Sequence, residues 1–393
     1  MLAEWIFWLG IGLVFYTYVG YGILVWILLR FRKNKPLNDI RSANNQFPEV
    51  SLLIAAYNEA GIIAEKVKNC QALDYPADRL QVVFVTDGSV DGTPELLRQY
   101  DHIRVLHEDG RKGKMAAVER AMAYIQTPIT VFTDANTFLN TQAIRELVQY
   151  FENPRIGAVA GEKRIMQQTD EAASAAGEGL YWHYESFLKK QDARLYSVVG
   201  AAGELYAIRT ALFESLPSDT ILDDFMQTLL IAAKGYRVAY APEAFAEEYA
   251  SADLKEELKR KIRICAGGFQ SMARLLPLLN PFRYGWLSFQ YVSHRVLRWT
   301  LAPLFLPFIF VANAWLFFCG SGWVYAVLFA LQCLFYIQAA LAYQWRNSPV
   351  SIKGFFVPLY FCIMNYSVYA GFLRYISGRQ SVKWEKARRA EGV

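Results

Sequence analysis

Cysteine and histidine are scarce in this sequence. Its 393 residues include five cysteines and four histidines, with no CxxC pair and no histidine–cysteine spacing typical of zinc. The sequence therefore supports neither a disulfide framework nor a zinc site of the usual spacing. Three of the cysteines lie within apolar runs, so we expect all five to be small packing residues.

Two common nucleotide-binding signatures are also missing. The chain has no GxxxxGK[ST] loop, and no GxGxxG motif opens a helix, so neither a P-loop nor a Rossmann dinucleotide site is supported. Disorder is excluded, because 54% of the residues are hydrophobic. The net charge is +5, and the basic residues lie mainly beside the apolar runs and in one short loop. We therefore expect no nucleic-acid partner.

Charge is absent from long runs at both ends of the chain. No charged residue occurs at positions 5–29, 299–345 and 354–373. At about 1.5 Å per helical residue, the first and third runs each match a ~30 Å hydrocarbon layer, and the second holds two spans joined at Gly320–Gly322. We therefore expect one membrane helix in residues 1–35 and three in residues 299–376. A cleaved signal peptide fits less well, because its shorter apolar core follows its basic residues.

The basic residues after the first run set the expected orientation. Under the positive-inside rule they place Met1 outside and the following domain in the cytosol, in an integral inner or plasma membrane protein. Four crossings then leave the tail, residues 377–393, outside, although the tail is basic. Either the rule fails here, or one apolar segment lies in the interface among membrane lipids instead of crossing.

Between the apolar ends, residues 47–250 alternate short apolar runs with helical stretches. Runs rich in Val and Ile predict strands at 50–56, 80–86, 103–107, 129–133 and 157–161. Helical spacing predicts helices at 61–73, 93–100, 114–125 and 141–151. This alternation is typical of an α/β domain with a mostly parallel, Rossmann-like sheet, whose ligands bind at the carboxyl ends of the strands.

Unusual polar loops follow three of these strands. Their sequences are AYNE at 56–59, TDGSVDGT at 86–93 and TDANT at 133–137. One such loop alone is a common turn or helix cap, but three at successive strand ends favour a site for a base edge, a sugar hydroxyl and a divalent cation. A fourth loop, GRKGKM at 110–115, has three cations that suit a diphosphate; a solvated basic loop is the alternative.

These loops occur together with DYP at 74–76, GELYAIR at 203–209 and LDDF at 222–225. In this order and spacing the motifs resemble the membrane-integrated family 2 glycosyltransferases, the group of cellulose, hyaluronan, poly-N-acetylglucosamine and chitooligosaccharide synthases. The resemblance covers roughly residues 48–298 and the helices at both ends. It implies an enzyme with a GT-A fold, a nucleotide-sugar donor and inversion at the anomeric carbon.

The resemblance also implies roles for single residues, carried over by position. Contacts with the substrates are implied for Tyr57, Glu59, Asp87, Lys114, Asp134, Gly203 and Glu204. Asp134 matches the first acid of the family's metal-binding Asp-x-Asp motif. Asn136 replaces the second acid, so we expect Mg²⁺ or Mn²⁺ to be held more weakly or through Asp134 alone. Asp224 matches the general base, and Asp223 matches the acid that precedes it.

The chemistry of sugar transfer accounts for these roles. A sugar hydroxyl is a poor nucleophile, so a carboxylate must take its proton as it attacks. Adjacent carboxylates disfavour each other's ionisation, which suits Asp223 and Asp224 to this task. A divalent cation and Lys114 offset the charge that develops on the leaving diphosphate. The alternative for Asp223 and Asp224 is a cap on a helix at 225–233, and both roles are compatible.

The main departure from the family lies further along the chain. Where its polysaccharide synthases carry Gln-x-x-Arg-Trp, this chain has RKIRI at 260–264. Arg263 keeps the arginine and Arg260 replaces the glutamine, and we expect both to contact substrate. Ile264 replaces the tryptophan, which removes a flat surface for an acceptor sugar. Long processive polymerisation is therefore disfavoured, and a short or lipid-linked acceptor is favoured.

Residues 251–298 are expected to form amphipathic helices at the membrane interface. The alternative for 255–263 is a basic helix that lies on anionic lipid. Arg295 and Arg298 are expected to anchor the chain at the interface before the next span. His294 is expected to be structural, because a lone histidine at a membrane edge seldom binds a substrate.

Two functional classes fit these observations. The first is an inverting glycosyltransferase that moves a sugar from a nucleotide sugar, UDP-sugar favoured, to a carbohydrate or polyprenyl-linked acceptor at the cytosolic face. Within it, a processive polysaccharide synthase coupled to export is an alternative. Four spans are few for a wide channel, which favours the lipid-linked acceptor or a homo-oligomer, and an export partner is a further alternative. The second class is a catalytically weak subunit that binds a nucleotide sugar within an export complex.

Overall fold

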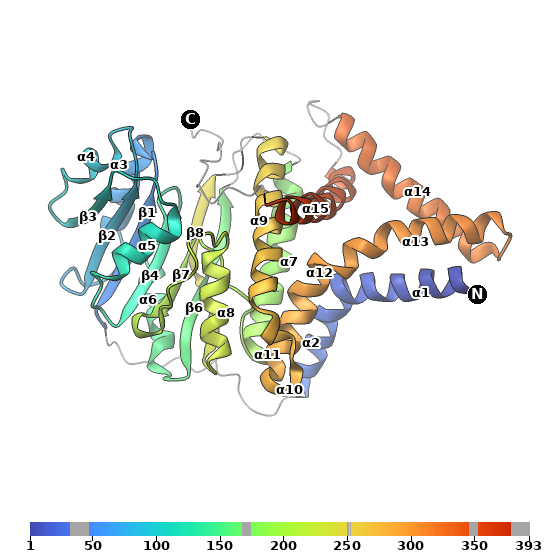
Figure 1. Ribbon diagram of the computed structural model, residues 1–393, viewed down its shortest axis with the longest axis horizontal. Helices are drawn as coiled ribbons and strands as arrows, with labels where there is room; N and C mark the ends of the chain where they lie inside the picture. The colour runs from blue at the N-terminus through green and yellow to red at the C-terminus, as the bar shows by residue number, and fades with distance from the viewer. Residues whose placement is uncertain (32–46, 167–173, 250, 252, 346–352, 379–393) are drawn as a thin grey trace.

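The computed structural model describes residues 1–31, 47–166, 174–249, 251, 253–345 and 353–378. A sheet lies at one end of the molecule, and long helices extend away from it at the other (Figure 1). Eight described strands form this one sheet, in the order β3-β2-β1-β4-β7-β6-β8-β5. The strands are β1 (Val50–Ala56), β2 (Leu80–Asp87), β3 (Ile103–Glu108), β4 (Ile129–Asp134), β5 (Phe138–Leu139), β6 (Ile156–Met166), β7 (Tyr206–Arg209) and β8 (Arg237–Tyr249).

Half of the sheet is parallel. β1 pairs with β2 and β4, and β2 pairs with β3, all in parallel. The register places Ala55 opposite both Val85 and Asp134, so the carboxyl ends of these strands meet at one edge. The polar loops after β1, β2 and β4 are therefore neighbours, as predicted. In the other half, β7 runs antiparallel to β4 and β6, whereas β8 is parallel to β6.

The five predicted strands are confirmed. Four of them end within one residue of the predicted position, and β6 continues five residues further, to Met166. Strands β5, β7 and β8 were not predicted from the sequence. Their signal is weak: β5 and β7 are short, and β8 mixes Arg, Pro and Glu with its apolar residues.

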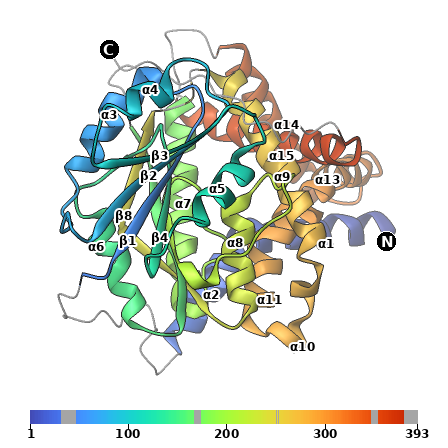
Figure 2. The same ribbon diagram turned by 60° about the vertical axis from the view of Figure 1, so that its left-hand side comes forward.

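Helices cover both faces of the sheet (Figure 2). One face carries α3 (Ala60–Gln71), α4 (Thr93–Leu97) and α6 (Ala143–Val148), and the other carries α5 (Lys114–Met122) and α8 (Asp223–Ala233). β1 is buried along its whole length, because alternate side chains enter the cores on opposite faces. A parallel strand covered on both sides needs such an unbroken apolar run.

Two long helices lie between the sheet and the apolar helices, namely α7 (Ser174–Leu195) and α9 (Leu254–Arg274). A Cβ at Gly267 of α9 would lie 2.8 Å from side-chain atoms of Ile221 and Leu222, so glycine lets α9 pack closely on the segment before α8. After α9 follow a 3₁₀ turn (Leu276–Leu279), α10 (Pro281–Tyr284), α11 (Trp286–Tyr291), a π-helical turn (Val292–Val296) and α12 (Leu297–Trp299).

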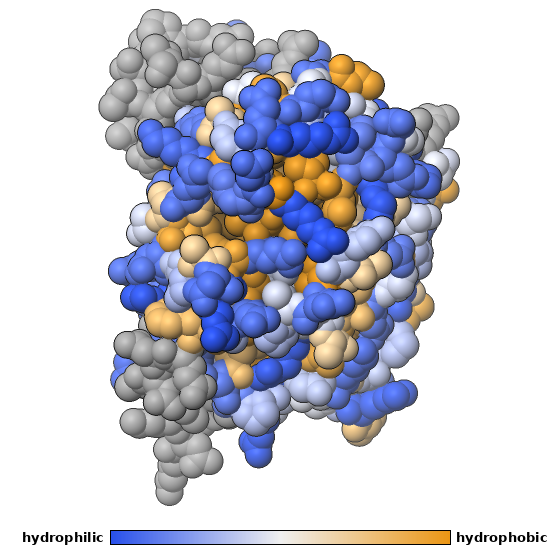
Figure 3. Space-filling model, turned by 90° about the vertical axis from the view of Figure 1, so that its left-hand side faces the viewer, coloured by the Kyte–Doolittle hydropathy of each residue, from blue (hydrophilic) through white to orange (hydrophobic). Residues whose placement is uncertain are grey.

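Four helices of the described chain are long and apolar enough to cross a membrane. The first combines α1 (Leu2–Phe15), a π-helical turn (Tyr16–Gly20) and α2 (Tyr21–Arg30). The others are α13 (Leu301–Phe318), α14 (Trp323–Gln344) and α15 (Lys353–Ile376). The predicted turn at 320–322 joins α13 to α14. The face of the molecule opposite α1, α13 and α14 is mainly hydrophilic (Figure 3). The basic tail at 379–393 lies outside the described residues.

Charged side chains are buried where α2, α7 and residues 292–298 meet. We call Glu185, Asp192, His294, Arg295 and Arg298 the junction cluster. Nδ1 of His294 is 2.5 Å from Oδ2 of Asp192, and Arg295 and Arg298 both pair with Glu185. The predicted interface anchor is wrong for Arg298, which is 7% exposed and held by a carboxylate inside the protein. The structural role expected for His294 agrees with its complete burial.

Candidate active site

The loop after β2 holds the basic loop at 110–115. Asp87 is buried, and its carboxylate accepts hydrogen bonds from the backbone N–H groups of Lys112 (3.1 Å) and Gly113 (2.6 Å). Gly113 has a φ of 100°, which favours glycine, and α5 begins at the next residue, Lys114. Asp87 thus fixes the start of α5 and the direction of Lys114. Its expected contact with the substrates stays a prediction.

The loop after β1 interlocks with the loop after β2. The backbone N–H of Asn58 donates to Oγ of Ser89 (3.1 Å), and that of Glu59 donates to Oγ1 of Thr93 (2.9 Å). Glu59 is buried, and Asn58 has a φ of 52°, so the chain turns sharply here. The two polar loops therefore form one rigid edge of the site.

The ring of Tyr57 lies beside the basic loop. The guanidinium carbon of Arg111 is 4.0 Å from the centroid of this ring, a cation–π contact. Three of the predicted loops, at 56–59, 86–93 and 110–115, therefore converge on one place. A flat ring next to cations suits a nucleoside diphosphate, whose base stacks and whose phosphates carry negative charge.

The predicted reacting groups also meet. Nζ of Lys114 donates to Oδ1 of Asp134 at 3.0 Å and lies 3.7 Å from Oδ2 of Asp223. A Cβ at Gly203 would lie 3.2 Å from Oδ2 of Asp224 and 3.7 Å from Nζ of Lys114, which places Gly203 between them. We call Lys114, Asp134, Asp223 and Asp224 the donor-site cluster. A small pocket opens at this cluster, above apolar side chains of β1, β4 and α5.

Burial and charge tune the acids of the donor-site cluster. Burial raises the pKa of Asp224 to about 7, and the neighbouring Asp223 adds to the rise. Burial also raises the pKa of Asp134, although Lys114 opposes this. Burial alone would lower the pKa of Lys114, but the three carboxylates hold it above its usual range. A carboxylate with a pKa near 7 is well matched to proton removal at neutral pH.

The charges of the donor-site cluster do not balance, because three carboxylates face one ammonium. A divalent cation would neutralise the surplus. Within the described residues, no group of three or more His, Cys, Asp and Glu side chains is placed to hold a metal alone. Asp134, and Asn136 two positions later, supply the oxygen ligands that Mg²⁺ and Mn²⁺ accept, and substrate phosphates complete such sites. The residues therefore fit a metal that is shared with a diphosphate.

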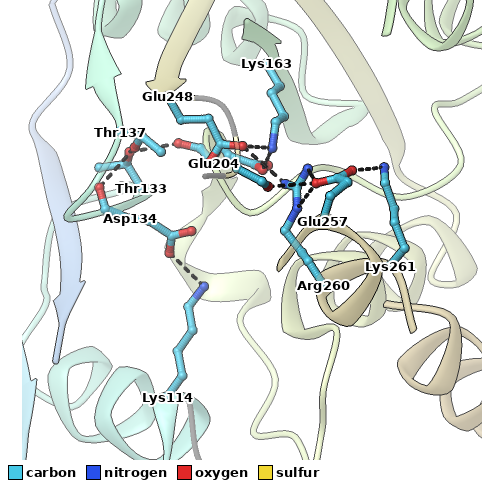
Figure 4. A network of polar contacts seen from close by, with 11 residues as sticks. Lys114, Thr133, Asp134, Thr137, Lys163, Glu204, Glu248, Glu257, Arg260 and Lys261 are labelled. Carbon is cyan, nitrogen blue, oxygen red and sulfur yellow. Dashed lines mark hydrogen bonds and ion pairs between the residues drawn. The ribbon is translucent and has the colours of Figure 1, made fainter. Parts of the chain in front are cut away.

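A network of alternating charges lies next to the donor-site cluster (Figure 4). We call Lys163, Glu204, Glu248, Arg260, Glu257 and Lys261 the α9 network. Among the residues that the structure describes, three cations face three carboxylates in this network. Burial alone would raise the pKa of Glu204, but Lys163 holds it below its usual range. The hydroxyl of Thr133 donates to the carbonyl of Glu204 (2.8 Å), which links the network to the Asp134 loop.

Within the α9 network, the cations Arg260 and Lys261 of α9 pair with carboxylates of the protein. Arg260 lies 3.2 Å from Glu248 and 2.9 Å from Glu257, so it ties α9 to β8. The expected lipid contact is wrong for Lys261, which is buried and pairs with Glu257. Contact of Arg260 with substrate stays a prediction.

Arg263 is placed differently. It lies one turn before Gly267, on the face of α9 that packs against the segment leading to Asp223 and Asp224. Among the described residues its buried Nε has no hydrogen-bond partner. A guanidinium in this position is suited to a phosphate of the donor, as the sequence predicts.

Three residues that support the site were not predicted from the sequence. Lys66 is fully buried, and its ammonium donates to the carbonyl of Thr137, at the end of the TDANT loop. Lys163 and Glu248 hold Glu204 and Arg260 in place. A usable signal existed for Lys66, since it lies on the apolar face of a predicted helix, where a lysine needs a partner. The other two lie on strand segments that were not predicted.

The fold and the site can be compared with known proteins. A family model described as "Glycosyltransferase like family 2" matches residues 48–267, more than half of the chain. The chain belongs to this family. The resemblance to family 2 glycosyltransferases, inferred from its motifs, is confirmed. Its acids at the strand ends, its basic loop and its paired aspartates therefore belong to a family 2 glycosyltransferase.

Curated relatives of this family 2 glycosyltransferase make glycolipids or polysaccharides. The β-monoglucosyldiacylglycerol synthase of Synechocystis sp. is 28% identical over 239 residues, which is 57% of this chain and 48% of that protein. The poly-β-1,6-N-acetyl-D-glucosamine synthase of Staphylococcus epidermidis is 24% identical over 268 residues, 65% of this chain and 63% of that protein. The chain thus spans about half to two thirds of the length of these relatives.

A solved structure shows the same fold along the whole chain. The mannosyltransferase PcManGT from Pyrobaculum calidifontis, in complex with GDP-Man and Mn²⁺, superposes with a TM-score of 0.72 at 23% identity. The superposition covers 95% of this glycosyltransferase and 100% of that chain. The GT-A fold with helices at both ends, expected from the sequence, is confirmed.

Proposed function

We propose that this glycosyltransferase transfers a sugar from a nucleoside-diphosphate sugar to a carbohydrate or lipid-linked acceptor at the cytosolic face of a membrane, with inversion. The observation that carries the proposal is the donor-site cluster, in which Asp224 has a pKa of about 7 and lies beside Asp223 and Lys114. A UDP-sugar is the favoured donor. A GDP-sugar is the alternative, because PcManGT was solved with GDP-Man.

The proposed step is a single displacement. Asp224 takes the proton of the acceptor hydroxyl while its oxygen attacks the anomeric carbon, and the bond to the diphosphate breaks on the opposite side. Attack from the opposite side inverts the anomeric carbon. Lys114 and Arg263 bind the phosphates and offset the charge that the leaving group gains. Mg²⁺ or Mn²⁺, held by Asp134 and Asn136, would supply Lewis-acid stabilisation of the same charge.

A short or lipid-linked acceptor is favoured over a growing polymer. Ile264 offers no stacking surface where polysaccharide synthases carry tryptophan, and four candidate spans leave little room for a wide channel. One relative is a glycolipid synthase. A processive synthase with an export partner or a second copy is the alternative, because another relative makes poly-N-acetylglucosamine.

A weak, donor-binding subunit is the least favoured function. Asn136 in place of an acid motivates it, but the complete set of Lys114, Asp223 and Asp224 opposes it. Donor binding alone would not require a carboxylate whose pKa lies near neutrality.

The test is transfer by the purified chain in detergent. Release of nucleoside diphosphate from UDP- and GDP-sugars would be followed with Mn²⁺ or Mg²⁺, with and without a membrane lipid extract. We expect metal-dependent release that the extract stimulates and that Asp224→Asn abolishes. Asp219→Asn, an exposed acid that pairs with Arg274, is the matched control. A chain that binds the donor but shows no metal-dependent turnover with any acceptor would contradict the proposal.

A further inference from the structure

One buried cation has no carboxylate partner. Lys189 of α7 is 3% exposed, and within the described part of the chain no ion pair or hydrogen bond reaches its ammonium. Glu185, one turn earlier on α7, is taken up by the junction cluster. Glu162 of β6 accepts hydrogen bonds from two hydroxyl groups instead. The ammonium faces the ring of Trp182, and an ammonium of a largely buried side chain without a carboxylate partner is stabilised further when an anion joins it.

Lys189 belongs to a group of lysines around Trp182. The ammonium nitrogens of Lys163, Lys261 and Lys189 lie 5.0, 5.6 and 5.8 Å from the centroid of the Trp182 ring. They come from three elements: β6, α9 and α7. The first two already pair with carboxylates of the α9 network, whereas Lys189 pairs with no carboxylate of the described chain. We call Trp182 and these three lysines the Trp182 site.

The Trp182 site lies between the catalytic domain and the apolar helices. Nζ of Lys261 is also 5.9 Å from the ring of Tyr360 on α15, one of the candidate membrane spans. On its other side, Lys163 pairs with Glu204, which follows Gly203 of the active site. A lipid can therefore place an anionic group at the Trp182 site while its hydrocarbon chains lie in the membrane.

We propose that the Trp182 site binds a phosphate ester group, with Lys189 as its principal cation. The ammonium of lysine binds phosphate as a compact point charge. Both a lipid phosphate and a free phosphate have this chemistry, and the contact with α15 favours the lipid. The inference deepens the proposed function, because it supplies the anionic group of a lipid-linked acceptor, and in that respect it rests on that function.

The test measures binding by the full chain in detergent. The probes are dioleoyl phosphatidic acid, as a lipid phosphate monoester, and inorganic phosphate mixed with dioleoylglycerol. Native mass spectrometry and thermal unfolding would be compared for wild type, Lys189→Met and Lys190→Met, where Lys190 is the exposed neighbour on α7. We expect Lys189→Met to weaken phosphatidic acid binding by about ten- to a hundredfold, as loss of a charged hydrogen bond predicts, and Lys190→Met to bind as wild type.

Each outcome is decisive. If phosphatidic acid binds and Lys189→Met weakens this binding, the phosphate group of the site belongs to a lipid. If inorganic phosphate binds and Lys189→Met weakens its binding equally, the site takes a soluble phosphate. Binding that is unchanged in Lys189→Met, or no binding of either probe to wild type, overturns the site. Because Lys189→Met removes an unmatched buried charge, its Tm without ligand should not fall, and a lower Tm would also overturn the inference. Metal-dependent release of nucleoside diphosphate by wild type tests the proposed function separately.

Discussion

The donor-site cluster and the junction cluster use the same kinds of side chain in opposite ways. In the donor-site cluster three carboxylates face one ammonium, and the side chains of Lys114 and Asp134 are each 22% exposed. In the junction cluster Glu185 and Asp192 are matched by His294 and two arginines, and the side chains of both acids are at most 2% exposed.

Charge pairing therefore distinguishes a cluster that stabilises the fold from one that binds a ligand. A fully buried ion must be paired, since removing it from water costs several kcal/mol. The junction cluster meets this requirement and joins α2, α7 and residues 292–298. A surplus of one sign persists only where water, a metal or a substrate can reach it. The donor-site cluster has such a surplus, and the small pocket opens beside it.

The largest effect is expected from a change at the proposed base, Asp224. Asp224→Asn keeps the shape but cannot take a proton, so we expect transfer to fall by about 10²–10⁴-fold. Donor affinity should change little. The measurement is kcat with saturating donor, next to donor binding by calorimetry. Residual activity within threefold of wild type would show that another group removes the proton.

A change in the junction cluster should lower the stability of the protein and leave donor binding unchanged. Glu185→Gln leaves Arg295 and Arg298 without their carboxylate, and loss of one partner of a buried ion pair costs about 3–5 kcal/mol. We expect a marked fall in Tm in detergent, with donor affinity of the folded fraction unchanged. Glu119→Gln, at an exposed position of α5, is the control. An unchanged Tm with lost turnover would show that the junction cluster is part of the catalytic machinery.

The raised pKa of Asp224 predicts how catalysis depends on pH. With a pKa of about 7, Asp224 is protonated and inactive below neutrality, so kcat/KM should fall about tenfold for each pH unit below 7. Asp223→Asn removes a neighbour that raises this pKa, and should move the fall to lower pH. A profile that is flat between pH 5.5 and 8, measured with donor and metal in excess, would be incompatible with this assignment.

The smallest expected effect is a gain in stability. Because the pKa of Asp224 is raised in the fold, the folded protein binds its proton more tightly than the unfolded chain. That contribution is present at low pH and is lost as pH rises from about 4 to about 7. Without metal or donor at pH 8, Asp224→Asn should therefore be more stable than wild type, by on the order of 1 kcal/mol. Thermal scans at pH 4.5 should show a smaller difference in Tm between Asp224→Asn and wild type. If Asp224→Asn is less stable than wild type at pH 8, the predicted direction of the effect is wrong.

Much of the fold was predictable because its signals are local. The apolar runs of β1, β2, β3 and β4 are short and bounded by turn residues, and each was found within one residue. The loops at 56–59, 86–93 and 133–137 were recognised as one site, because parallel strands bring their carboxyl ends together. β8 was not predicted, because its Ala residues and its interspersed Pro and Glu residues give little hydrophobic contrast.

The amino-acid sequence alone is enough to predict the family, the parallel half of the sheet, the apolar spans and the acids of the candidate active site. Which charges are matched depends on the tertiary structure. Lys163 meets Glu204 and Glu248, and Arg298 meets Glu185, across long stretches of chain that the packing of α7, α9 and β8 brings together. Periodicity and motifs act over a few residues, whereas the pairing of buried charges depends on contacts between distant elements. The surplus at Asp134, Asp223 and Asp224, and the unmatched Lys189, follow from that pairing alone.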